Sequence, residues 1–335
     1  MLYLLKPLQA GSLVLNNRLV MPPMATSKAS SDGRVSKEIL DYYKEKSDGG
    51  YISLIIIEHS FINQEGKASE NQLSVADDSA IPGLKDLADV IHQNGSKTMM
   101  QINHAGSAAP RELIGTDPSG PSAVINPRRG DAIPHELTRG EIADIVQAFQ
   151  DAARRVKTAG FDGVEIHSAH GYFLNQFLSP LTNKRTDEYG GDILNRVRIH
   201  LQVIEGVRAI VGDDYPVLLR LGASDFMTGG TTIEDSQKAA RRFEQAGINI
   251  LDISGGFCGY NVPGQSGQGY FAALSAALKE VVSVPVILTG GISEAEAAEE
   301  LLKEGKADLI GVGRAILKDS HWARKVFESS QYSSS

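Results

Sequence analysis

Two histidines and a tyrosine lie close together in the sequence, at the point where an apolar segment ends. His167 is the last residue of the run Phe161–His167, and His170 and Tyr172 follow it. Imidazole and phenol groups donate hydrogen bonds and transfer protons, so these side chains could serve as paired donors to a ligand oxygen. A metal site is the first alternative, but it needs a third ligand, and nothing nearby except Glu165 resembles one. Buried structural histidines are the second alternative.

Two other apolar runs contain a polar side chain that burial would penalise in the absence of a partner. Gln101 lies at the end of one run and Arg220 within another. A buried amide needs partners for its donor and acceptor atoms, and a buried guanidinium needs an anion. Gln101 is therefore either a ligand-binding amide or a core glutamine with satisfied hydrogen bonds. Arg220 indicates either a delocalised negative charge on a ligand or an internal ion pair, for which Glu165 is a candidate.

Two glycine-rich segments near the C-terminus are candidates for phosphate binding. Thr289-Gly290-Gly291-Ile292 and Gly311-Val312-Gly313-Arg314 each follow or end an apolar run and precede a helical pattern. Backbone N–H groups in such loops bind anions, and the last two loops of α/β barrels often hold a phosphate. Together these segments predict a phosphate-binding site.

The segment Pro22-Pro23-Met24-Ala25-Thr26 predicts a rigid surface, because two prolines fix their backbone angles. Met24 and Ala25 could lie flat against an aromatic ligand, and a rigid rim of the fold is the alternative. A flat shelf, a cation at Arg220 and a phosphate site together outline a flat phosphorylated cofactor, and flavin mononucleotide (FMN) fits that outline. No G-x-G-x-x-G motif follows a strand in the required context, so a nicotinamide nucleotide would dock only transiently.

These side chains need a fold that brings strand ends together. Eight short β-branched or aliphatic runs alternate with helical patterns, which is typical of repeated βα units and a parallel sheet. The runs are Leu19–Met21, Tyr51–Ile57, Lys97–Ile102, Phe161–His167, Pro216–Leu221, Ile248–Ile253, Val284–Leu288 and Asp308–Val312. The sequence therefore predicts one α/β domain over residues 1–328, a single (β/α)8 TIM barrel with its active site at the C-terminal ends of the strands.

Other local patterns add detail to the predicted barrel. Thr138 with Glu141, and Ser293 with Glu296, have the spacing of capping boxes at helix starts. Residues 103–136 contain five prolines and four glycines, and a loop of this length predicts a lid over the active face. The Ser-rich tail 329–335 is expected to be flexible.

Composition limits the classes of function. The chain of 335 residues has 33 Lys and Arg against 41 Asp and Glu, and its net charge of −8 disfavours a nucleic-acid partner. Its single cysteine, Cys258, allows neither an intrachain disulfide nor a cysteine-ligated metal cluster. No apolar stretch approaches the ~20 residues of a membrane span. We expect a cytoplasmic enzyme with a small-molecule substrate and no metal; a homo-oligomer is compatible with the sequence.

Several motifs, taken in order along residues 3 to 325, closely resemble the Old Yellow Enzyme family of NADH:flavin oxidoreductases. They are Asn17-Arg18, Met21-Pro22-Pro23-Met24, His167-Ser168-Ala169-His170-Gly171-Tyr172, Arg185-Thr186-Asp187-Glu188-Tyr189-Gly190-Gly191, Asn195-Arg196 and Gly311-Val312-Gly313-Arg314. The resemblance implies non-covalent FMN with NAD(P)H as the hydride donor. The residues that it assigns to FMN binding are Pro23, Met24, Ala25, His59, Gln101, Arg220, Gly290, Gly291, Gly313 and Arg314.

The resemblance also implies a reaction. His167 and His170 resemble the pair that binds a substrate carbonyl oxygen, and Tyr172 resembles the family's proton donor. An α,β-unsaturated carbonyl compound would receive a hydride from flavin N5 on its β-carbon and a proton from Tyr172 on its α-carbon. Quinones, nitro compounds or the oxidative direction are the alternatives within the family. A flavin-free aldolase or isomerase is a further alternative, but no lysine ends any predicted strand, and a non-catalytic ligand-binding barrel is the last.

Three departures from the family pattern are visible. Ala25 stands where one branch carries a flavin-tuning cysteine and others carry threonine. No cysteine run follows the barrel, so a barrel-only member without an iron–sulfur cluster is expected. The tail 329–335 has no arginine, which does not support an arginine lent to a neighbouring subunit.

Overall fold

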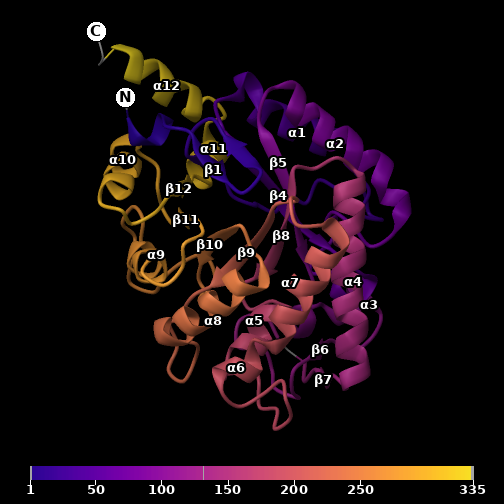
Figure 1. Ribbon diagram of the computed structural model, residues 1–335. Helices are drawn as coiled ribbons and strands as arrows, with labels where there is room; N and C mark the ends of the chain where they lie inside the picture. The colour runs from indigo at the N-terminus through magenta and orange to yellow at the C-terminus, as the bar shows by residue number, and fades with distance from the viewer. Residues whose placement is uncertain (1, 131, 333–335) are drawn as a thin grey trace.

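Eight parallel strands close into a barrel with helices around its outside in the computed structural model, which describes residues 2–130 and 132–332 (Figure 1). In order around the barrel, the strands are β3 (Leu19–Met21), β4 (Leu54–Phe61), β5 (Lys97–Asn103), β8 (Gly163–Ser168), β9 (Val217–Gly222), β10 (Ile250–Ser254), β11 (Val286–Thr289) and β12 (Leu309–Gly311). Strand β12 pairs with β3 and so completes the ring. The predicted single (β/α)8 TIM barrel is confirmed.

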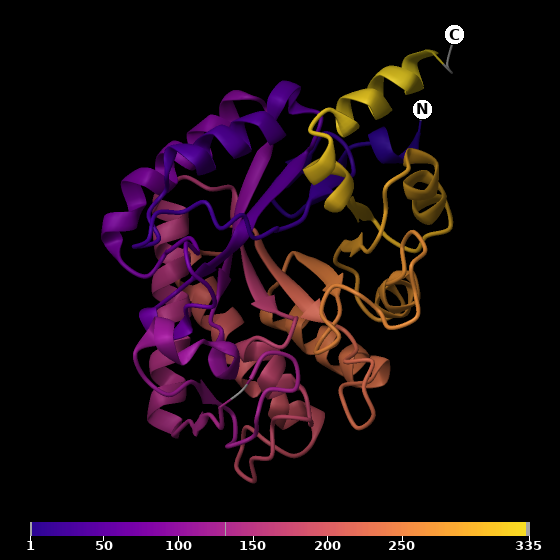
Figure 2. The same cartoon turned by 180° about the vertical axis from the view of Figure 1, so that it is seen from behind.

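The helices follow the strands in the order that the fold requires and cover the barrel on all sides (Figure 2). The longer helices are α1 (Lys37–Lys46), α2 (Ile81–Gln93), α4 (Arg139–Thr158), α7 (Arg198–Val211), α8 (Ile233–Ala246), α9 (Ala272–Lys279), α10 (Ala295–Lys303) and α12 (Trp322–Tyr332). The short ones are α3 (Arg111–Ile114), α5 (Phe173–Leu178), α6 (Ile193–Arg196) and α11 (Arg314–Lys318). Single 3₁₀ turns lie at Tyr3–Leu5, Asp48–Gly50, Gln64–Gly66, Asp78–Ala80 and Gly106–Ala108.

One of the two predicted capping boxes forms. The Thr138 hydroxyl accepts a hydrogen bond from the Glu141 backbone N–H, and the Glu141 carboxylate accepts one from the Thr138 N–H, at the start of α4. The prediction of a second capping box at Ser293 is wrong, because α10 begins at Ala295 and no side chain caps it. The Gln268 side-chain oxygen instead accepts from the backbone N–H groups of Ser293 and Glu294.

A short antiparallel hairpin, which we did not predict, closes the N-terminal end of the barrel. It consists of β1 (Leu8–Ala10) and β2 (Leu13–Leu15). Its side chains pack into a hydrophobic cluster with residues from the early parts of the barrel strands, namely Val20, Leu54, Ile56, Met99, Leu218, Ile250, Ile287 and Leu309. Because this end is filled, only the opposite end, where the strands finish, can open to a ligand.

Strand β4 is longer than predicted and carries an irregularity that concerns the site. The predicted run was Tyr51–Ile57, but the strand begins three residues later, at Leu54, and continues to Phe61. Ile57 lies opposite Met100 of β5, but Ser60 lies opposite Ile102, so β4 holds one extra residue. Such a bulge redirects side chains. It contains Glu58 and His59.

The segment 103–136 is long but contains local structure. It includes α3 and two short paired strands, β6 (Ser119–Gly120) and β7 (His135–Glu136). At the other end of the chain, α12 includes the first four residues of the predicted flexible tail 329–335, and residues 333–335 lie outside the described part. No helix within the described residues is both long and apolar enough to cross a membrane.

Candidate active site

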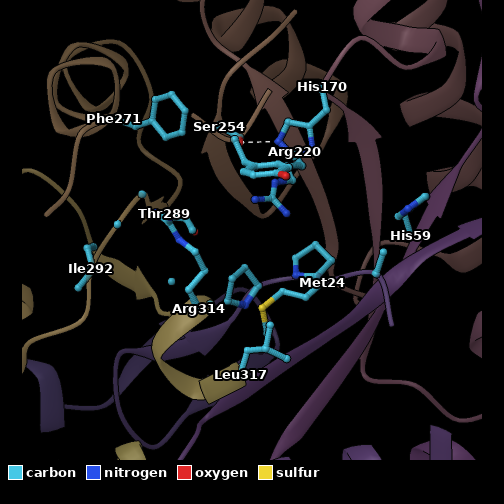
Figure 3. Close-up of a pocket in the computed structure, with 18 of the residues that line it drawn as sticks. Met24, His59, His170, Arg220, Ser254, Phe271, Thr289, Ile292, Arg314 and Leu317 are labelled. Atoms are coloured by element: carbon cyan, nitrogen blue, oxygen red, sulfur yellow. Dashed lines mark hydrogen bonds between the residues drawn. The ribbon is translucent and has the colours of Figure 1, made fainter. Parts of the chain in front are cut away.

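A cavity of about 730 Å³ opens at the C-terminal ends of the barrel strands (Figure 3). Every residue predicted from the sequence to bind a cofactor or to act in catalysis lines it. These residues are Pro23, Met24, Ala25, His59, Gln101, His167, His170, Tyr172, Arg220, Gly290, Gly291, Gly313 and Arg314. Figure 3 shows Arg314 and Thr289 on one side of the cavity and His59 on the opposite side, with Met24 between them.

The two histidines and the tyrosine of β8 and its exit loop face one another. The ring centre of His167 lies 5.2 Å from that of His170 and 5.3 Å from that of Tyr172. The chain turns sharply here, since His170 and Gly171 both have positive φ, at 61° and 75°. The His170 N–H donates to the Gly255 carbonyl, and the Gly171 N–H donates to the Asn175 side chain. These bonds hold a left-handed turn that a histidine rarely adopts, which brings three functional groups to one place.

Both histidines are neutral at physiological pH. Burial lowers the pKa of His167 and of His170 well below the usual range, and the positive charge of Arg220 lowers both further. The His170 Nε2 lies 2.7 Å from the Ser254 hydroxyl, as Figure 3 shows, and this contact orients the ring. The buried Nδ1 of His167 has no hydrogen-bond partner in the described chain. Two neutral imidazoles can donate hydrogen bonds to an oxygen, but they carry no positive charge.

Tyr172 remains a protonated phenol under the same conditions. Burial raises the pKa of its hydroxyl, and the nearby charges of Arg129 and Arg128 only partly oppose that rise. The guanidinium of Arg129 lies over the Tyr172 ring, 5.1 Å from its centre. The ring of His59 lies 5.3 Å from the same ring, and burial lowers the pKa of His59 to about 4. The tyrosine is therefore the proton-carrying group at this side of the cavity.

Arg220 forms an internal ion pair, but with a partner that we did not predict. Its Nε lies 3.2 Å from the Asp252 carboxylate, because Arg220 of β9 and Asp252 of β10 lie opposite each other in register. Glu165, the carboxylate suggested by the sequence, instead accepts a 2.6 Å hydrogen bond from the Gln101 amide of β5. The candidate pair of Arg220 with Glu165 was therefore wrong.

Of the two buried carboxyl groups, Glu165 holds its proton more tightly. Burial and the negative charge of Asp252 raise the pKa of Glu165 well above its ordinary range, and burial raises the pKa of Asp252 to about 6. Near neutral pH, Glu165 is protonated and Asp252 is ionised. The single positive charge of Arg220 is thus matched by a single negative charge, which lowers the cost of burying it.

The shelf after β3 is fixed by the bulge in β4. The Glu58 carboxylate accepts hydrogen bonds from both the backbone N–H and the hydroxyl of Thr26, which directly follows Ala25. Burial raises the pKa of Glu58 to about 7, and the bonds from Thr26 oppose this rise. Pro23, Met24 and Ala25 are in this way held as one wall of the cavity.

The two glycine loops form the opposite wall. Gly290 and Gly291 have φ of 141° and 70°, and a Cβ at Gly291 would lie 2.8 Å from the Gly267 carbonyl oxygen. Only glycine fits there. Arg314, the first residue of α11, donates to the Tyr270 hydroxyl at 3.3 Å and lines the same wall. Backbone groups and a guanidinium can therefore approach one anionic group from the two loops.

Several lining residues were missed by reading the sequence. They include Arg129, Ser254, Tyr260, Tyr270 and Phe271. Ser254 ends β10 and follows the same strand-end rule as Gln101, so its position was available in the sequence. The others lie in irregular segments, where no periodicity predicts direction. Among the described residues, no aspartate or glutamate lines the cavity, and no group of three or more His, Cys, Asp or Glu is arranged to hold a metal ion.

Comparison with known proteins gives one consistent answer. Residues 3–332 match the model of the NADH:flavin oxidoreductase / NADH oxidase family. The chain is 42% identical to an NADH oxidase of Thermoanaerobacter brockii, over 96% of this chain and 50% of that protein. It therefore spans about half the length of that relative. It is 37% identical to an NADPH dehydrogenase of Geobacillus thermodenitrificans, over 95% of this chain and 92% of that protein.

A solved structure shows the same architecture. The Old Yellow Enzyme homologue from Zymomonas mobilis superposes with a TM-score of 0.85 at 26% identity, and the match covers 97% of this chain and 92% of that chain.

The raised pKa of Glu165 leads to a prediction for Glu165→Gln. An amide imitates a protonated carboxyl, so the variant should be close to wild type in stability at pH 5. The folded-state pKa of Glu165 is raised, so this group stabilises the wild type at low pH, and that contribution is lost as pH rises above the ordinary carboxyl range. The variant should therefore gain stability relative to wild type by at most about 1.4 kcal/mol per pH unit between pH 5 and 8.

Denaturant unfolding of both proteins across this range measures the difference. A Glu165→Gln variant that instead loses stability relative to wild type as pH rises would show that Glu165 is ionised in the folded protein.

Proposed function

The chain belongs to the NADH:flavin oxidoreductase / NADH oxidase family, that of the Old Yellow Enzymes, and on this basis we propose that it uses FMN and NAD(P)H to reduce the activated C=C bond of α,β-unsaturated carbonyl compounds. The observation that carries the proposal is the placement of two neutral histidines and a protonated tyrosine at the barrel mouth. The ring centre of His167 is 5.2 Å from that of His170 and 5.3 Å from that of Tyr172. Arg220 and Gln101 line the same cavity.

The cavity fits FMN in size and in chemistry. Its volume of about 730 Å³ lies within the usual range for cofactor pockets. Two lining side chains have a buried polar atom without a hydrogen-bond partner in the described chain, namely His167 Nδ1 and Thr289 Oγ1. Gly290, Gly291 and Gly313 line the opposite wall without side chains, so their backbone can approach a phosphate. The flat ring of FMN, its polar edge and its phosphate would each contact groups of suitable chemistry on the cavity wall.

Each wall of the cavity has a part in holding this cofactor. Gly290, Gly291, Gly313 and Arg314 hold the phosphate. The shelf Pro23–Ala25 supports the ring, and His59 lies at the far end of the cavity. When bound, FMN supplies the two-electron centre that takes a hydride from NAD(P)H and passes it to the second substrate.

Arg220 and Gln101 would hold the polar edge of the ring. Arg220 supplies a permanent positive charge where negative charge accumulates on reduction, because a guanidinium does not lose its proton. Gln101 donates one amide hydrogen to Glu165, and this bond fixes the orientation of the amide toward the cavity.

His167 and His170 bind the carbonyl oxygen of the substrate. Hydrogen bonds from two N–H groups withdraw electron density from the C=C bond and stabilise the negative charge that develops on the oxygen. Their lowered pKa values suit this role, because neutral imidazoles keep the site free of an added charge before the substrate arrives. Ser254 supports the pair by fixing the His170 ring.

Tyr172 delivers the proton that completes the reduction. Its raised pKa keeps the phenol protonated, and the enolate that forms is basic enough to take that proton. Tyr172 is only 3% exposed, so bulk water does not replace it easily. The segment 103–136 contributes Arg129 above this residue, and we assign that segment the role of a lid.

Replacement of Tyr172 by phenylalanine should separate the two halves of the reaction. Reduction of the bound flavin by NAD(P)H should continue at near the wild-type rate, because no proton from Tyr172 is needed. Reoxidation by cyclohexenone should slow by about 100-fold or more, the usual value of a general acid. Rapid-mixing absorbance measurements report both rates. Equal slowing of the two would remove Tyr172 from the role of proton donor.

Replacement of His167 or His170 by alanine should weaken the binding of phenols, which place a phenolate oxygen at the carbonyl site. Loss of one hydrogen bond to a charged oxygen corresponds to roughly 10- to 100-fold in affinity. A titration of the oxidised protein with phenol, followed by visible absorbance, measures the effect. His135→Ala is the control, since His135 is exposed on the surface near α4. Unchanged phenol affinity in both site variants would contradict an oxyanion site.

Two other classes of electron acceptor test whether the C=C bond of an enone is the group that the protein reduces. Quinones and nitroaromatics, compared with cyclohexenone in steady-state assays, distinguish an ene-reductase from a flavin reductase of the same family. Negligible turnover of cyclohexenone beside rapid turnover of a quinone would favour the reductase.

A further inference from the structure

One charged residue of the cavity, Arg129, has no part in the proposed reaction. Three arginines line the cavity: Arg220, Arg314 and Arg129. The first faces the ring edge and the second the phosphate. Arg129 lies near neither in this account, since its guanidinium is over the ring of Tyr172, at the substrate side. In a chain of net charge −8, a cavity lined by three arginines and no described carboxylate is a marked local excess of positive charge.

The position of Arg129 is built into the fold. Asn126 is 2% exposed, and its side-chain oxygen accepts hydrogen bonds from the backbone N–H groups of Arg128 and Arg129. The Asn126 amide donates to the Gly171 carbonyl, one residue before Tyr172, and to Ser107. The backbone that carries Arg129 is therefore tied to the loop that carries the proton donor, which sets the guanidinium beside the phenol.

Arg129 has no carboxylate partner within the described residues. The ion pairs of the described chain use other arginines. The neighbouring Arg128 does not line the large cavity; its guanidinium lies over the Tyr260 ring, and its Nη1 is 3.5 Å from the Phe257 carbonyl. Arg129 also lines a second, smaller cavity with Arg128 and Arg111. A guanidinium with unused donors at the rim of a cavity suits a planar, two-oxygen anion.

We propose that Arg129 selects substrates that carry a carboxylate: the site takes activated alkenes whose anionic group is bound by the Arg129 guanidinium while the carbonyl oxygen is bound by His167 and His170. This inference rests on the proposed function, because it uses the same histidine pair. The Arg129 guanidinium lies 5.1 Å from the Tyr172 ring centre, which is 5.3 Å from the His167 ring centre. Arg129 and His167 therefore both lie beside Tyr172 on the wall of the same cavity.

Hydroxybenzoates test this with a binding signal that needs no turnover. The phenol oxygen of 3- or 4-hydroxybenzoate occupies the histidine pair, and the carboxylate reaches Arg129. The matching hydroxybenzamides have the same shape and no charge. Titrations of the oxidised, FMN-loaded protein, followed by visible absorbance, give the affinity of each. We expect at least one of the two carboxylates to bind about tenfold or more tightly than its amide, as a charge-assisted pair would give.

Three variants locate the cause of that preference. Arg129→Met should bring the ratio of carboxylate to amide affinity close to one, and Arg129→Lys should keep part of it, because the charge remains and the paired donors do not. Arg139→Met is the matched control. Arg139 is exposed, pairs with Glu188 and lines neither cavity, so this change removes the same charge and should leave the ratio as in wild type.

The remaining outcomes overturn the proposal. A wild type without preference, or an Arg129→Met variant in which both ligands weaken equally, would show that Arg129 only supports Tyr172. A variant in which NADH or NADPH binds more weakly while the ratio is unchanged would assign Arg129 to the phosphates of the hydride donor. If no phenol, charged or neutral, perturbs the spectrum of any of these proteins, the histidine site of the proposed function itself fails.

Discussion

The site depends on the burial of one positive charge at the end of β9. Arg220 is 4% exposed, and a guanidinium cannot lose its proton to escape that position. Asp252, opposite it on β10, provides the compensating charge, and Glu165 must keep a proton so that a second negative charge is not added. Arg220, Asp252 and the protonated Glu165 therefore place a guanidinium at the floor of the cavity, while the total charge of the three groups stays close to zero. That arrangement favours an anionic group arriving from above, as a reduced flavin would be.

The barrel lowers the cost of burying these charges, because the register of adjacent strands determines which side chains lie next to each other. Register places Arg220 beside both Asp252 and His167, and places Gln101 beside Glu165. Hydrophobic side chains from the hairpin β1–β2 fill the other end, so polar groups accumulate only where the strands finish. Irregular backbone supplies the rest: the bulge in β4 presents His59, and the left-handed turn at His170 and Gly171 presents the substrate-binding pair.

Much of this was visible in the sequence, for definite reasons. The eight strands were predicted because strands covered on both faces appear as continuous apolar runs, and the site residues because polar groups interrupt or follow those runs at their ends. Asp252 was missed because its partner is set by the register of β9 and β10, which a single sequence does not show. The cap at Ser293 failed because Gln268, far away in the sequence, occupies the helix start. Arg129 lies in a segment without periodicity. Its backbone N–H donates to Asn126, and Asn126 is held in place by a tertiary hydrogen bond to the Gly171 carbonyl that a single sequence does not show.

The central claim is that the charge of Arg220 acts on the cofactor, and the reduction potential of bound FMN tests it most directly. Equilibration with a redox dye, followed by absorbance, gives that potential in the wild type and in Arg220→Met. A cation beside the ring edge stabilises the anionic reduced form, so its removal should lower the potential, whether Asp252 then ionises or takes up a proton. A potential equal to or higher than that of the wild type in a variant that still binds FMN would contradict this account.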